Sequence, residues 1–119
     1  MTTEPIFRSD RFFQAWRYTV SHGQLLIQSQ KTDLVATRLE ILFKDVEYMA
    51  VRPVMHGLSI APCSRDRLPD FLAGLAVTGA WYELRCDKGK GYIACGAVAF
   101  SEDALGHGHP SALMDDFGL

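Results

Sequence analysis

Residues 12–29 alternate large apolar and polar side chains on either side of a turn sequence, His22-Gly23, and this predicts a β-hairpin. Glycine adopts positive φ without steric cost and histidine visits that region more often than most residues, which suits a type I′ turn. A two-residue loop there pairs Trp16 with Ser29 and puts Tyr18 on the same, mainly apolar face. We therefore expect antiparallel β-structure, with Trp16 and Tyr18 in the core.

Further strands are expected over residues 37–44, 58–61, 81–86 and 92–100. The phase of the apolar pattern changes at Asp45, and Gly96 interrupts the last run, so both positions are expected to bend the chain. Residues 92–100 are apolar on both faces, as in a central strand. Together these segments predict a mainly β or β-dominated α+β fold of about six or seven strands and one or two short helices, curling into a partly open barrel or sandwich.

The second hairpin joins residues 81–86 to 92–100. A five-residue loop over 87–91 would pair Cys86 with Tyr92 and place Cys95 opposite Glu83. A disulfide between the two cysteines is not expected from this register.

Residues 64–79 allow two structures. The apolar residues Leu68, Phe71, Leu72 and Leu75 have helical spacing, with Pro69 in the first turn and Gly79 as a stop. The alternative is an apolar loop that crosses one end of the sheet.

The chain of 119 residues is expected to be a single domain, because this length suffices for one core. Residues 1–11 are polar and are expected to be a flexible lead-in. Residues 102–119 contain four acids and no Lys or Arg, which predicts a mildly acidic, loosely packed tail.

The net charge of −2 gives no electrostatic reason to expect nucleic acid or a membrane as a partner. No apolar run approaches the roughly 20 residues of a membrane span, and the N-terminus does not resemble a secretory signal. Three cysteines do not make a disulfide framework, so a cytoplasmic location is expected.

Two nucleotide-binding patterns are matched in part near Gly89-Lys90-Gly91 and are rejected. The letters G-x-G-x-x-A require a following helix, whereas residues 92–100 have strand character. The RNA-stacking strand of an RRM begins similarly, but Ile93 and Ala94 replace its small residue and aromatic.

The sequence offers one candidate site for metal binding and one for cysteine chemistry. His107 and His109 are candidate metal ligands, although a zinc site needs a third ligand that the sequence does not place. Cys63 precedes Arg65 and Arg67, and nearby arginines favour a thiolate. No cofactor is expected.

Four aromatic residues, Trp16, Tyr18, Trp81 and Tyr92, are candidates to line a ligand cavity or an interface. Packing in the core is the alternative role for them.

The sequence carries no convincing catalytic set. The leading hypothesis is therefore a small intracellular binding or assembly module without catalytic activity, partnered by itself in a homo-oligomer or by another protein. The first alternative is a binder of a small or apolar molecule with a cavity lined by the four aromatic residues. The second is a small enzyme that depends on a metal or on cysteine.

Overall fold

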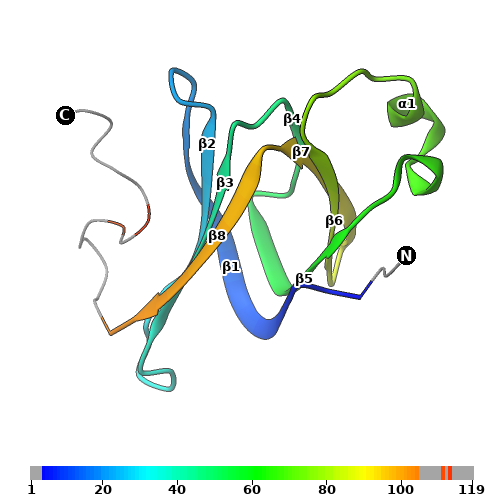
Figure 1. The fold of residues 1–119 in the computed structure, drawn as a ribbon. Coiled ribbons are helices and arrows are strands. Elements are labelled where there is room, and N and C mark those ends of the chain that lie inside the picture. The colour runs from blue at the N-terminus through cyan, green and yellow to red at the C-terminus, as the bar shows by residue number, and fades with distance from the viewer. Residues whose placement is uncertain (1–3, 105–110, 112, 114–119) are drawn as a thin grey trace.

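The computed structural model of this protein describes residues 4–104 together with Ser111 and Leu113. Within this part of the chain, eight strands form one antiparallel sheet in the order β4-β7-β6-β5-β1-β2-β3-β8 (Figure 1). The strands are β1 (Phe7–Thr19), β2 (Gln24–Ser29), β3 (Arg38–Lys44), β4 (Tyr48–Ala50), β5 (Val54–Pro62), β6 (Ala80–Cys86), β7 (Gly89–Cys95) and β8 (Ala97–Asp103). Two short helical segments, η1 (Arg65–Arg67) and α1 (Asp70–Ala73), join β5 to β6. The expectation of a mainly β fold is confirmed.

Two bends curl the sheet. Asp45, with a φ of 55°, separates β3 from β4, and Gly96 separates β7 from β8. The bends are bonded to each other, because Gly96 N–H donates to the Lys44 carbonyl oxygen at 2.8 Å and Glu47 N–H donates to that of Ala94 at 2.8 Å. The pairing of β3 with β8 therefore continues into that of β4 with β7. The bends expected at Asp45 and Gly96 are confirmed, and the curled sheet, which is not closed, is a partly open barrel.

The core fills the concave side of this curl. Because side chains alternate between the two faces of a strand, every second residue of the central strands points inward. The buried residues of the core are Phe13, Leu25, Ile27, Ile41, Phe43, Met55, Leu58, Ile60, Leu84, Ile93 and Cys95.

Two smaller apolar clusters cover parts of the outer face. Leu68 and Leu72, from the segment that contains η1 and α1, pack on Trp81 of β6. This segment stands beside β6 in Figure 1. Leu113 packs on Leu26 and Leu42 of β2 and β3. The sheet is thus covered on the outside at two separate places.

The first hairpin forms, but the register expected for it is wrong. β1 and β2 pair Thr19 with Gln24, which leaves residues 20–23 as the loop instead of His22-Gly23 alone. His22 N–H donates to the Thr19 carbonyl oxygen and Gly23 N–H to that of Val20, each at 3.3 Å, so the chain turns twice in succession. Of these loop residues only Gly23 has positive φ, 58°, so a type I′ turn is excluded.

A β-bulge between Ala15 and Arg17 changes the face assignment along β1. The extra residue is Trp16, and Tyr18 pairs with Leu25 instead of Ile27. Trp16 is 42% exposed and Tyr18 is 38% exposed. The expectation that these two side chains belong to the core is wrong, because the bulge and the longer loop move them to the rim of the barrel.

The second hairpin also has a different register. Cys86 pairs with Gly89, so the loop is the dipeptide Asp87-Lys88 and not residues 87–91. Gly89 has a φ of 125°, which allows the chain to reverse this early. Cys95 pairs with Ala80 and not with Glu83.

The expectation of one central strand over residues 92–100 holds only for its first half. β7 lies between β4 and β6, whereas β8 ends the sheet and pairs with β3 alone. The bend at Gly96 sends the two halves to different neighbours.

Residues 64–79 form little helix: η1 is a single 3₁₀ turn and α1 has 4 residues. Pro69 precedes α1 as its N-cap rather than lying in its first turn. Leu72 is buried whereas Phe71 is 73% exposed, so one turn is enough to cover Trp81. No helix in the described part of the chain is long and apolar enough to cross a membrane.

The limits expected for the lead-in and the tail are corrected. Residues 7–11 belong to β1, where Phe7 pairs with Ile60, and residues 102–103 belong to β8. Residues 7–11 contain one apolar side chain, Phe7, and residues 102–103 contain none, so neither segment shows the apolar–polar alternation that predicts a strand.

Candidate functional site

The four aromatic residues predicted to line one cavity are divided between two places. Trp16 and Tyr18 lie together on β1, at the rim of the barrel. Trp81 and Tyr92 lie on β6 and β7, in the cluster under α1. A single cavity lined by all four is therefore not formed.

Trp16 and Tyr18 face β4 across a groove of about 360 Å³, which we call the aromatic groove. Its lining is Ala15, Trp16, Arg17, Tyr18, Leu25, Met49, Ala50 and Val51. The ladder between β1 and β5 ends at Gln14, and Ala15 N–H still donates to the Pro53 carbonyl oxygen at 2.8 Å. Beyond this point β1 and β4 are not paired in the sheet, and Trp16 is the bulged residue of β1. Met49 is 37% exposed on the opposite side. Leu25 and Val51 belong to the core, so the groove opens onto the interior of the barrel.

Trp81 has a packing role. It is 5% exposed, and its ring lies 5.6 Å from that of Tyr48 at an interplanar angle of 56°. Its Nε1 has no hydrogen-bond partner among the described residues. Trp81 thus fills the space between the sheet and α1. This is the core-packing role, the alternative to lining a cavity.

His107 and His109, the candidate metal ligands, lie outside the described residues. Within the described part of the chain, no three His, Cys, Asp or Glu side chains lie close enough together to hold a metal ion.

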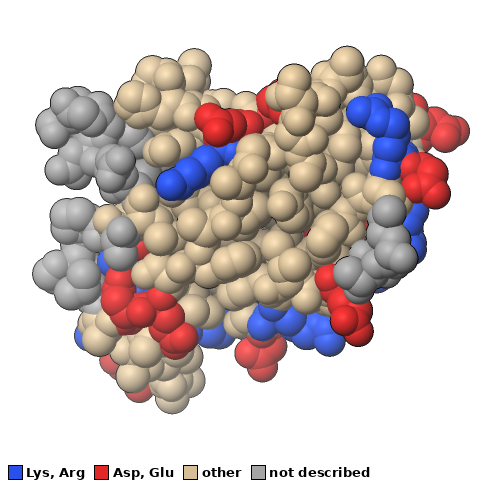
Figure 2. All heavy atoms as spheres, viewed as in Figure 1, with Lys and Arg blue, Asp and Glu red and all other residues tan. Residues whose placement is uncertain are grey.

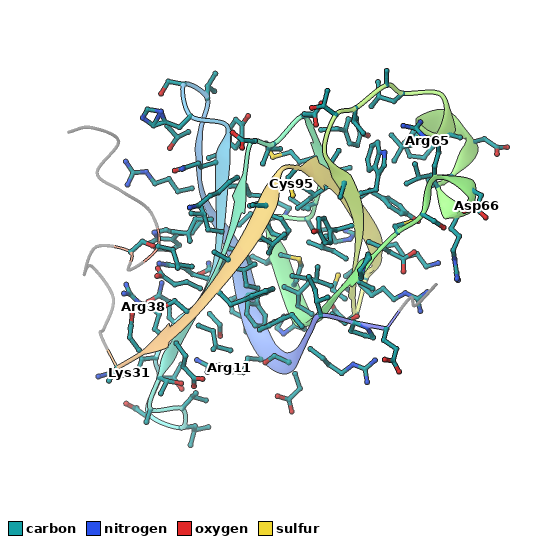
Figure 3. All side chains as sticks on the ribbon, viewed as in Figure 1. Arg11, Lys31, Arg38, Arg65, Asp66 and Cys95 are labelled. Atoms are coloured by element: carbon teal, nitrogen blue, oxygen red, sulfur yellow. The ribbon has the colours of Figure 1, made fainter. Side chains whose placement is uncertain are left out.

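The three cysteines are free thiols. Burial raises the pKa of Cys63, and this outweighs the opposite effect of Arg67, so the thiolate expected from nearby arginines is not favoured. Burial raises the pKa of Cys95 to about 11, and Cys95 lies inside the bend between β7 and β8 (Figure 3).

A second groove, which sequence reasoning missed, lies on the outer face of β1, β5 and β6. This arginine groove has a volume of about 240 Å³. It is lined by Pro5, Arg8, Ser59, Ala61, Pro62, Cys63, Arg67, Glu83 and Arg85. At the end of the molecule near the N-terminus, Lys and Arg side chains lie among Asp and Glu side chains (Figure 2).

The strand register explains how distant basic residues meet in the arginine groove. Ser59 of β5 pairs with Arg8 on one side and with Arg85 on the other, and Arg85 pairs with Lys90. Directly opposed residues share a face, so a row of three cations crosses four strands above one serine. Arg67 of η1 adds a further cation. This row forms only through the pairing of β1, β5 and β6, which are distant in the sequence. No local sequence motif predicts it.

Glu83 is the one acid among the described residues that line the arginine groove. It accepts a hydrogen bond from Arg85 Nε at 2.7 Å and forms an ion pair with Lys90 Nζ at 3.5 Å. Partial burial acts to raise the pKa of Glu83, but Arg85 and Lys90 outweigh it and hold the pKa below its ordinary value. Glu83 is therefore ionised at neutral pH and neutralises part of the basic row.

A buried polar cluster lies on the outer face of β2 and β3. Arg38 and Glu40 are each 1% exposed, and Gln28 Nε2 donates to Glu40 Oε2. Arg38 is bonded to Asp103 of β8, and Ser111 Oγ donates to Glu40 Oε1 at 3.0 Å. Figure 3 places Arg38 on the side of the molecule opposite to Arg65. Because its members are already bonded to one another, this cluster supports the structure rather than a ligand.

Comparisons with protein-family models, with curated proteins and with solved structures find no significant match to this chain.

Proposed function

We propose that this protein is a binding module without catalytic activity that takes up an apolar ligand in the aromatic groove. The observation that carries the proposal is the exposure of Trp16, Tyr18 and Met49 on the two walls of one groove. Aromatic side chains offer large, rigid contact surfaces, and methionine adapts its shape to different ligands.

The size and lining of the groove support a small ligand. A volume of about 360 Å³ lies within the range of about 300–1,000 Å³ for small-molecule sites. Arg17 is the single charged residue among the described lining residues, and the others are apolar or aromatic, which suits an apolar ligand. The part of this lining that the structure describes contains no acid, histidine or cysteine, which supports a role in binding rather than catalysis.

Self-assembly is the second candidate function, because the same exposed aromatic surface suits a homo-oligomer or another protein partner. For either function we propose a cytoplasmic location, with which the three free thiols are consistent.

A neutral fluorescent probe, N-phenyl-1-naphthylamine, tests the first candidate by its increase in emission on binding. We expect saturable binding to the wild type and a loss of about tenfold or more in affinity for Trp16→Ala. Phe71→Ala is the matched control, because Phe71 is an exposed aromatic on α1 outside the groove. Equal losses in both variants, or binding unaffected by Trp16→Ala, would contradict the proposal.

Light scattering coupled to size exclusion tests the second candidate. A dimer that dissociates in Trp16→Ala but not in Phe71→Ala supports assembly through this groove. A monomer at all concentrations excludes it.

A further inference from the structure

The arginine groove is basic in a chain whose net charge is −2, because its described lining has three arginines against the single carboxylate of Glu83. We propose that this groove binds one phosphate group, either inorganic phosphate or the phosphate of a small phosphomonoester. This site lies on the outer face of β1, β5 and β6 and does not depend on the aromatic groove.

Two of the arginines are available for a ligand. Arg8 and Arg67 are exposed, and within the described part of the chain neither side chain has a hydrogen bond or an ion pair, although Arg67 interacts electrostatically with the neighbouring Asp66. Arg85 gives only its Nε to Glu83, so the pair fixes the Arg85 side chain over the groove. Guanidinium groups bind phosphate through paired N–H donors, which makes arginine the suitable residue for this anion.

The basic row is only partly neutralised by protein groups. Arg8 and Arg85 lie on the two strands that flank Ser59, so their Cα atoms stand two strand spacings, about 10 Å, apart on one face. The carboxylate of Glu83 is already shared by Arg85 and Lys90. An anion placed between Arg8, Arg67 and Arg85 would meet positive charge from three sides.

The floor and the size of the groove fit a phosphate group. The hydroxyl of Ser59, at the centre of the row, is a donor of the kind that phosphate oxygens accept. A volume of about 240 Å³ is below that of a typical drug-sized site, so the ligand is a small one.

The test is a titration followed by ¹H–¹⁵N NMR of the whole chain at low salt and pH 7.5, where a phosphomonoester is mainly dianionic. Phenyl phosphate and inorganic phosphate are the two probes, and benzoate is the carboxylate comparison. We expect saturable shifts at Ser59, Cys63 and Arg85 with phosphate probes and weaker binding of benzoate. Similar affinity for the two phosphate probes would show that the groove recognises the phosphate group alone. Tighter binding of phenyl phosphate would show that the ligand is a phosphomonoester.

Arg8→Gln and Arg67→Gln are each expected to weaken phosphate binding about tenfold or more, since each removes charged hydrogen bonds. Arg52→Gln is the matched control, an exposed arginine outside the groove, and is expected to bind as the wild type does. Unchanged thermal unfolding of the three variants shows that the fold is retained. No saturation by about 10 mM probe, equal binding of benzoate, or an equal loss in Arg52→Gln would overturn the proposal.

Discussion

Arg38 of β3 and Asp103 of β8 face each other across the strand pair and share two hydrogen bonds, of 3.1 and 2.8 Å. Arg38 is 1% exposed, and Glu40 lies 3.8 Å from its other terminal nitrogen. The hydrogen bond to Asp103 outweighs burial and raises the pKa of Arg38. A buried cation is thus held between two carboxylates at the last strand of the sheet.

Arg38→Ala is expected to lower the free energy of unfolding by about 3–5 kcal/mol, because it leaves Glu40 buried without its counter-ion. Urea denaturation followed by circular dichroism measures the loss. Lys88→Ala, at an exposed loop position, serves as the control and is expected to change stability by less than about 0.5 kcal/mol. A loss below about 1 kcal/mol for Arg38→Ala would show that the cluster does not support the sheet.

The two tryptophans are expected to differ in their contribution to stability. Trp81→Ala empties the space under α1 and is expected to cost about 3–5 kcal/mol, whereas Trp16→Ala is expected to cost less than about 1.5 kcal/mol. The same denaturation experiment compares them. If Trp16→Ala were as damaging as Trp81→Ala, Trp16 would be a core residue, as the two-residue loop implied.

Glycine is expected to be required at position 91, where β7 pairs closely with β4. A Cβ atom added there would lie 2.4 Å from the carbonyl oxygen of Ala50, so the β4–β7 pairing must shift. Gly91→Ala is expected to destabilise the protein by about 1–3 kcal/mol. Gly74→Ala is the control, because nothing lies within 4 Å of its added Cβ. Equal melting temperatures of the two variants would contradict the close approach.

Glu47 is expected to make stability depend on pH in the acid range. Its carboxylate accepts hydrogen bonds from the N–H groups of Thr78 at 2.9 Å and Gly79 at 2.7 Å, and these bonds lower its pKa. The folded protein then holds the proton less tightly than the unfolded chain does. The stabilisation is present above the ordinary glutamate pKa of about 4.3 and is lost as pH falls through the lower folded value.

Melting temperatures measured between pH 7 and pH 3 test this expectation. Glu47→Gln is expected to be less stable than the wild type at pH 7, with a difference that shrinks as the pH falls below about 4. Asp10→Asn, at an exposed position on β1, controls for the loss of one negative charge. If the difference in melting temperature between the wild type and Glu47→Gln stayed constant with pH, the negative charge of Glu47 would not be the source of its stabilising effect.

Local sequence patterns located most strands of this protein. The alternation over 37–44 predicted β3 within one residue of its start, and the phase change at Asp45 and the glycine at position 96 predicted both bends. These features are local, because alternation and positive φ depend only on neighbouring residues. The registers expected for both hairpins differ from those in the structure. Each register depends on the length of the loop, and several turn types with different loop lengths suit these sequences.

The candidate sites depended on more distant contacts. Residue type alone makes Trp16 and Tyr18 candidates for binding, but only the bulge between Ala15 and Arg17 and the separation of β1 from β4 expose them on a groove. Arg8 and Arg85 are far apart in sequence and meet only because β5 pairs with both β1 and β6.

The β class of this chain and its bends at Asp45 and Gly96 can be predicted from neighbouring residues, because side-chain periodicity and the backbone conformation of single residues set them. Which strands pair, in which register, and hence which side chains share a groove depends on the folded molecule. Pairing between distant strands is fixed by the packing of the whole core, and a shift of one residue in register moves every side chain of a strand to the other face.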